Sequence, residues 1–221
     1  MRANYCGPHS QPKNHNLARR ACAPYLSAMF IETETTPNPS SLKFLPGRQV
    51  MASGTREFAS PESAEASPLA EAIFDTGEVV NVFFGFEFVT VTAAPGADWG
   101  ALKSQVVTIL LDHFVSEAPL FKGGSADGIS VPGEEIEMVV EDRAEDAEVI
   151  ASIQELLETR VRPAVASDGG DIAYRGFSEG VVYLMLQGAC AGCPSSSATL
   201  KQGIESLLTH YIPEVREVRA A

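Results

Sequence analysis

The sequence predicts an α+β protein made of two small α+β domains joined by an acidic linker that contains glycine and proline. Three observations lead to this prediction. The 221 residues are enough for two small domains. Apolar residues make up 45% of the chain and charged residues 20%, which is sufficient for packed cores. Strand and helix patterns form two groups, at residues 29–117 and 147–221, on either side of a linker at 118–146.

Residues 1–28 differ in composition from the rest of the chain. They hold four basic residues and no acidic one, whereas the whole chain has 16 Lys+Arg against 29 Asp+Glu. A basic leader without acids is typical of an organelle transit peptide, but Pro8, Pro12 and Pro24 and a weak amphipathic pattern argue against one. We therefore expect a disordered leader in front of Met29.

The first domain is expected to combine short strands with two helices. Pro37 and Pro39 remove strand hydrogen bonds and force a turn between two short strands. Ser67 is a favourable cap for one helix, and Asp98 for another with apolar residues on one stripe. The expected elements are strands at 30–35, 41–45, 79–84 and 88–92, a helix from 68 that Gly77 ends, and a helix from 99 to 114.

The linker is recognised by its composition. Residues 118–133 concentrate proline, glycine and serine, and residues 134–148 add eight acids against Arg143 alone. Such acidic runs are usually solvated, although this one could attract a basic partner. Val139 and Val140 are candidates for a short strand within it.

The second domain is expected to run helix, strand, strand, helix, strand. Its first helix has an apolar stripe that Pro163 should end or kink. Asp168 and Asp171 flank two glycines and are expected to shape a turn, while Arg160 and Arg162 pair with the acidic linker or face water. The expected elements are a helix at 149–161, strands at 172–177 and 181–186, a helix at 195–211 and a strand at 215–218.

Composition also disfavours several classes of function. The net charge of -13 repels phosphate backbones and anionic lipid, so we expect neither nucleic acid nor a membrane as a partner. The sequence has no uninterrupted apolar run of about 18 residues, the length that a membrane-spanning helix requires. Four cysteines in 221 residues are far too few for a secreted disulfide scaffold, which favours a reducing compartment.

One motif carries chemistry, the pair Cys190 and Cys193 between a predicted strand and a predicted helix. Gly192 between the two cysteines lets the chain turn so that both sulfur atoms face one point. Pro194 can begin the helix, whose unpaired amides and positive dipole end would favour thiolates. A single C-x-x-C is weak evidence by itself, and three kinds of site must be compared.

The three kinds of site differ in what else they require. A thiol-disulfide oxidoreductase of the thioredoxin type needs several elements after its active-site helix, and too little chain follows Cys193. A structural zinc site needs four ligands, but His210 lies about 25 Å away at the far end of the helix, and we give His113 no ligand role. An iron-sulfur cluster also needs four thiolates, which two chains could supply about a twofold axis. A competing arrangement within one chain adds Cys6 and Cys22 from the leader.

Several longer motifs resemble those of a known family. In the second domain they are Arg160–Val165, Asp168–Asp171, Gln187–Ser196, Thr199–Lys201, Gly203–Glu205 and Pro213–Val215. In the first domain they are Thr36–Pro39, Leu42–Phe44 and Val82–Gly85. With these segments the second domain resembles the C-terminal domain of the NifU family, and the first resembles the N-terminal domain of Nfu-type scaffolds.

The resemblance implies an iron-sulfur cluster scaffold or carrier rather than an enzyme. It implies that Cys190 and Cys193 bind a 4Fe-4S cluster shared between two subunits, so that the loaded protein is a homodimer. It further implies that the cluster comes from upstream assembly machinery and passes to apo iron-sulfur proteins, with the first domain as an adaptor for partners. We expect the bacterial cytoplasm, or the mitochondrial matrix if residues 1–28 are a transit peptide. The alternative function is a thiol-disulfide oxidoreductase that uses the same cysteines.

Overall fold

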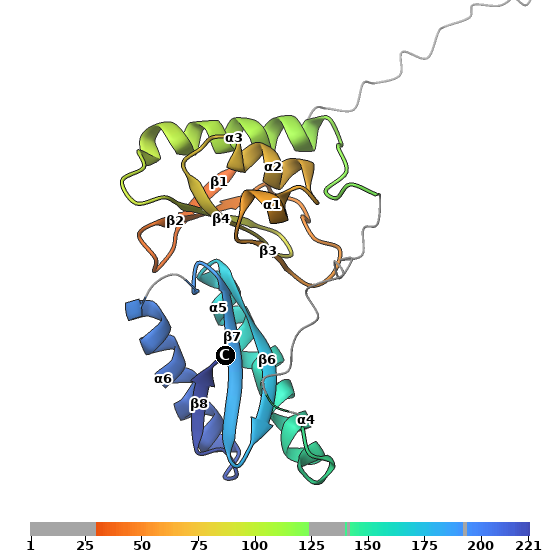
Figure 1. The fold of residues 1–221 in the computed structure, drawn as a ribbon, viewed down its shortest axis with the longest axis vertical. Helices are drawn as coiled ribbons and strands as arrows, with labels where there is room; N and C mark the ends of the chain where they lie inside the picture. The colour runs from red at the N-terminus through yellow and green to blue at the C-terminus, as the bar shows by residue number, and fades with distance from the viewer. Residues whose placement is uncertain (1–29, 124–139, 141, 192–193) are drawn as a thin grey trace, which may run out of the picture.

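The structure is a computed structural model and describes residues 30–123, 140, 142–191 and 194–221. It has two sheets, each with its own helices and its own apolar core, which confirms the predicted α+β class (Figure 1). Among the described residues, no helix is long and apolar enough to cross a membrane. The predicted leader lies outside the described residues, as does Val139, and Val140 is not in a strand.

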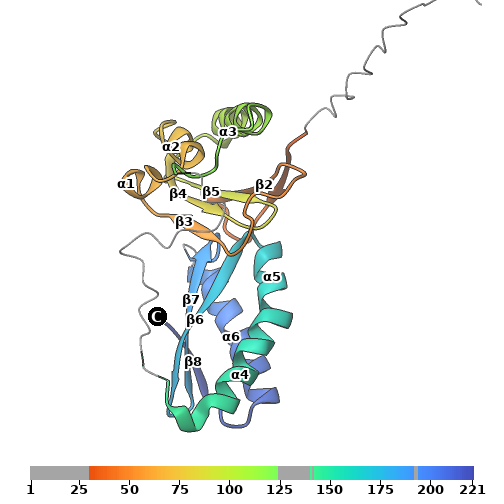
Figure 2. The same ribbon diagram turned by 90° about the vertical axis from the view of Figure 1, so that its right-hand side faces the viewer.

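The first domain is a five-stranded antiparallel sheet with helices on one face (Figures 1 and 2). Its strand order is β1-β2-β5-β4-β3. The predicted strands and both helices are present within one or two residues of their expected ends. The elements are β1 (Glu32–Thr35), β2 (Ser41–Leu45), β3 (Arg56–Phe58), α1 (Pro61–Ala64), α2 (Pro68–Phe74), β4 (Val79–Phe84), β5 (Val89–Ala93) and α3 (Trp99–Val115).

Two short elements of this domain, β3 and α1, were not predicted. β3 has only three residues, too few to show an alternating pattern, and pairs with the edge of β4. α1 follows directly and has four residues, held by Ser60, whose side chain accepts a hydrogen bond from the Ser63 amide. β3 matters for the site because it carries Glu57 to the face of the sheet opposite the helices.

The second domain packs helices against one face of a three-stranded sheet (Figure 2). The order is β6-β7-β8, with β6 antiparallel and β8 parallel to β7. A 3-10 turn at Ala144–Asp146 leads into the first helix. The other elements are α4 (Ala147–Leu156), a π-helical turn (Leu157–Val161), α5 (Arg162–Ser167), β6 (Gly170–Ser178), β7 (Val181–Gly188), α6 (Pro194–Tyr211) and β8 (Glu217–Ala220).

The helix that Pro163 was expected to end or kink continues through this residue. α4 and α5 are joined by the π-helical turn, and Pro163 lies in the first turn of α5. A π turn accommodates a residue that cannot donate the regular helical hydrogen bond, so the chain keeps its direction to Ser167. This longer helix brings α5 up to the turn in front of β6.

Candidate metal centre

Cys190 lies at the strand-to-helix junction, two residues after β7 and four before the start of α6. Its side chain is buried, with 4% of the residue exposed, and packs with the core of the second domain. Cys193, the second predicted ligand, is outside the described residues, as are Cys6 and Cys22. The structure therefore describes one of the two predicted ligand side chains.

Glycines decide how closely the chain packs around the Cys190 sulfur. At Gly170, the first residue of β6, a Cβ atom would lie 2.9 Å from Cys190 Sγ and 2.5 Å from the carbonyl oxygen of Gln187. Gly188 has a φ of +67°, and a Cβ there would lie 2.8 Å from the carbonyl oxygen of Gly169. The Ala189 amide donates to that same carbonyl. Larger residues at these positions would displace the loop that carries Cys190.

A cavity of about 630 Å³ adjoins the Cys190 side chain. Helix α6, the π-helical turn and α5 form most of its walls, and Pro37 of the first domain reaches its edge. Most of the lining is apolar, with Arg160 and Asp168 as its charged residues. The lining residues are Pro37, Arg160, Val161, Ala164, Asp168, Ala189, Cys190, Thr199, Leu200, Gly203, Ile204 and Leu207.

The electrostatic surroundings of Cys190 favour the thiol over the thiolate. Burial raises the pKa of Cys190 to about 11, and the negative charge of Asp168 adds to the increase. At Cys190, burial and Asp168 thus act against the thiolate form that the start of α6 was expected to favour. A metal ion that binds the sulfur must displace its proton.

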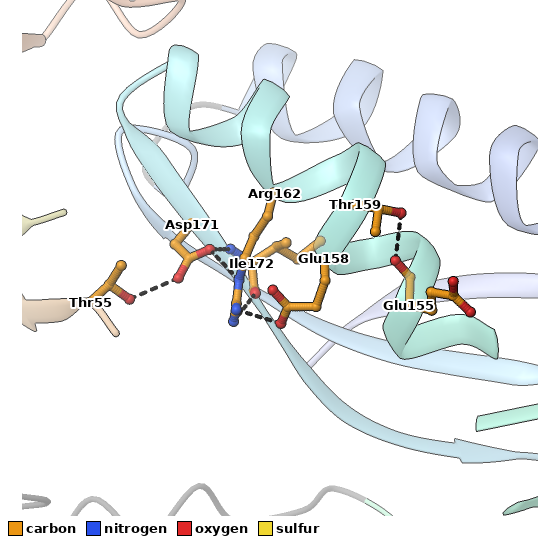
Figure 3. Close-up of polar contacts among 7 residues, drawn as sticks. All are labelled: Thr55, Glu155, Glu158, Thr159, Arg162, Asp171 and Ile172. Atoms are coloured by element: carbon orange, nitrogen blue, oxygen red, sulfur yellow. Dashed lines mark hydrogen bonds and ion pairs between the residues drawn. The ribbon is translucent and has the colours of Figure 1, made fainter. Parts of the chain in front are cut away.

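Asp171 connects the two domains next to this loop (Figure 3). Its Oδ1 accepts hydrogen bonds from Arg162 Nε at 2.9 Å and from the Ile172 amide at 2.7 Å. Its Oδ2 accepts from Thr55 Oγ1 of the first domain at 2.8 Å. Arg162 also pairs with Glu158. Asp171 does more than shape a turn, and the described acidic partners of Arg162 are Asp171 and Glu158.

The other residues weighed as ligands lie apart from Cys190. His113 is buried on α3 of the first domain, and His210 is near the end of α6. Arg160, which was expected to pair with the linker or face water, lies over the ring of Tyr211, with its Cζ atom 5.1 Å from the ring centroid. Within residues 30–123, 140, 142–191 and 194–221, no three histidine, cysteine or acidic side chains gather as a metal site.

Two family models match the chain. The model described as "Scaffold protein Nfu/NifU N terminal" matches residues 31–117, and the model described as "NifU-like domain" matches residues 153–219. The human protein "NFU1 iron-sulfur cluster scaffold homolog, mitochondrial" is 42% identical over 232 residues, covering 99% of this chain and 87% of the human one. This chain belongs to the Nfu/NifU family.

Plant members of the Nfu/NifU family are similarly close. "NifU-like protein 5, mitochondrial" of Arabidopsis thaliana is 49% identical over 192 residues, which cover 86% of this chain and 67% of the relative. "NifU-like protein 4, mitochondrial" of the same plant is also 49% identical, over 86% of this chain and 65% of the relative. The predicted family is confirmed. Family members described as scaffolds agree with the prediction that this protein is not an enzyme.

The names of these relatives also bear on the compartment. All three are described as mitochondrial, so they give no support to the bacterial cytoplasm.

Sequence reasoning missed the contribution of the first Nfu-type domain to the cysteine loop. Asn38 donates to the Ala189 carbonyl, and Thr90 donates to the Gly169 carbonyl. Glu57 accepts a hydrogen bond from the Gly188 amide. Asn38 belongs to a motif that carried the family resemblance, but there it indicated only a turn. Nothing in a single sequence pairs residue 38 with residue 189, because their contact depends on how the two domains meet.

Proposed function

We propose that this protein is an iron-sulfur cluster scaffold and carrier that binds a 4Fe-4S cluster with Cys190 and Cys193 of two chains. The observation that supports it is the place and spacing of the cysteines. Cys190 lies between β7 and α6, and Cys193 is the only other cysteine near it in the sequence. A cluster needs about four thiolates, and two such loops supply them.

The residues around Cys190 suit a cargo that is held and then released. Gly170 lets the backbone of β6 lie close against the sulfur, because a Cβ atom there would be 2.9 Å from Cys190 Sγ. Unpaired amides at the start of a helix favour an anionic group. The negative charge of Asp168 works in the opposite direction, against negative charge on the sulfur. A cluster between two loops can be attacked by the thiolates of an acceptor protein through ligand exchange. Apo iron-sulfur proteins are the recipients in this proposal, and upstream assembly proteins are the source.

The burial of Cys190 disfavours this residue as the attacking thiol of a thiol-disulfide oxidoreductase. The attacking species in disulfide exchange is an accessible thiolate, whereas burial raises the pKa of Cys190. The mitochondrial names of the relatives lead us to propose the mitochondrion as the compartment, with residues 1–28 as the segment to test for targeting.

Anaerobic reconstitution with iron and sulfide tests the proposal. We expect about four irons per two chains, together with a doubling of the solution mass. Cys190→Ala and Cys193→Ala should each lose the iron and the dimer together. The matched control is Cys6→Ala with Cys22→Ala, which should keep both.

Two results would contradict this assignment. Loss of iron in the Cys6→Ala, Cys22→Ala control would favour a cluster held within one chain. A colourless wild-type protein that reduces insulin disulfides would favour the oxidoreductase instead.

A further inference from the structure

The first domain has a sheet face that its helices leave open, and this face is buried against the second domain (Figures 1 and 2). Alternation along the strands directs Lys43, Phe83 and Thr90 to this face. They are 7%, 0% and 1% exposed. Phe83 is absent from the core under the helices, although its neighbours Val82 and Phe84 belong to it. The second domain therefore covers a face that would otherwise expose an aromatic ring to water.

The first set of contacts holds the turn in front of β6. Thr90 Oγ1 donates to the carbonyl oxygen of Gly169 at 2.8 Å, and Lys43 Nζ donates to that of Ser167 at 3.2 Å. Gly169 has a φ of +83°, and a Cβ atom there would lie 2.9 Å from Thr90 Oγ1. Thr90 therefore packs so closely against Gly169 that residue 169 has no space for a side chain.

The second set of contacts holds the residues immediately before Cys190. Asn38 Nδ2 donates to the carbonyl oxygen of Ala189 at 3.3 Å, and the Gly188 amide donates to Glu57 Oε1 at 3.0 Å. A Cβ atom at Gly188 would lie 3.0 Å from the Phe83 ring. The first domain therefore contacts Gly188 and Ala189, the two residues immediately before Cys190.

We propose that this open sheet face is a docking surface for residues 167–169 and 188–189 of its own chain, which flank Cys190, and that docking competes with a second copy for access to Cys190. The inference rests on the proposed function, because the competing event is the sharing of a cluster between two loops. In the docked form Asn38 and Glu57 bind the residues next to Cys190, while Pro37 lies at the edge of the adjoining cavity. A second chain must bring its own cysteines to this same loop, and the first domain occupies one side of the approach.

Thr90→Glu is the variant that tests docking. A longer, charged side chain cannot fit against the Gly169 carbonyl, whose oxygen would repel it. Thr108→Glu is the matched control, because Thr108 is exposed on α3 and distant from this face. Small-angle X-ray scattering of the metal-free full chain should give the same radius of gyration for wild type and control, and a larger one for Thr90→Glu. Far-UV circular dichroism checks that the fold is retained.

Cluster assembly on the same proteins tests competition. Only undocked chains can bind a second chain, so a high fraction of docked chains lowers the apparent affinity for dimer formation. A variant that undocks should therefore form the cluster-bridged dimer about threefold faster or more. Thr90→Val removes only the hydroxyl and should shift scattering and assembly in the same direction by less. It serves as the test if the glutamate variant unfolds.

Three outcomes separate this inference from the proposed function. Thr90→Glu chains that separate their domains but assemble dimers no faster than wild type would overturn competition. A wild-type chain that is already extended in scattering would overturn docking. A compact wild-type chain that binds no cluster under any condition would overturn the proposed function and the competition, and would leave docking established by scattering alone.

Discussion

His113 shows how burial of one side chain sets a response to pH. Only 9% of the residue is exposed, and its ring packs edge-on against Phe114 with centroids 5.3 Å apart. Burial lowers the pKa of His113 below 6.5, and the positive charge of Arg48 lowers it further. The folded protein therefore holds a neutral imidazole where the unfolded chain takes up a proton.

We expect the free energy of unfolding to fall as the pH drops below about 6.5, because only the unfolded state binds the extra proton. The stabilisation is present above the pKa of the unfolded chain and is lost towards the lower pKa of the folded one. His113→Gln cannot charge and should show a shallower decline between about pH 6.5 and 5 in urea titrations. His210→Gln, at an exposed position, should decline like wild type. Equal slopes for all three proteins would show that His113 does not contribute.

At the scale of single elements, one ion pair fixes α5 against β6. Arg162 on α5 donates to Asp171 on β6, and Asp171 is only 6% exposed. The same carboxylate accepts from its neighbour's amide and from the first domain. Removing its charge therefore weakens the hydrogen bonds of three donors, of which Arg162 and Thr55 are partly exposed.

Asp171→Asn should lower the free energy of unfolding of the second domain by about 2–3 kcal/mol, since the amide cannot accept from Arg162 and Thr55 at once. Glu158→Gln is the control. Glu158 binds the same arginine from the surface, with 56% of its side chain exposed, and its loss should cost less than about 1 kcal/mol. Denaturant titration measures both. A control that costs as much as the test variant would show that Asp171 is not the main partner of Arg162.

At the scale of the whole molecule, each domain has its own core, and polar contacts join them. The two apolar clusters share no residue. The contacts between domains include hydrogen bonds to backbone groups of the turns around Cys190. Separate cores mean that each half can fold by itself.

We expect residues 30–123 and 140–221, made as separate chains, to bind each other weakly, with a dissociation constant of about 0.1–1 mM, because the linker no longer supplies effective concentration. Amide chemical shifts of Gly169 and Gly188 should move on titration with the first half. The same titration with the Thr90→Glu variant of the first half should leave them in place. Halves that show no mutual shifts at millimolar concentration would contradict the docked arrangement.

Local pattern determined the class, the family and most of the elements of this protein. Strand alternation, capping residues such as Ser67 and Asp98, and the spacing of Cys190 and Cys193 are properties of neighbouring residues, so one sequence displays them. β3 was too short for any period to appear. Pro163 indicated that the helix ends or kinks, and a π-helical turn lets it continue instead.

Only the tertiary structure decided what surrounds the cysteine. Asn38, Glu57 and Thr90 come from the first domain and meet residues 169, 188 and 189 of the second, more than seventy residues away along the chain. The same packing buries Cys190 and raises its pKa, against the effect expected from the helix start alone. Burial and contacts between domains depend on which surfaces meet in space, and no pattern of neighbouring residues contains that information.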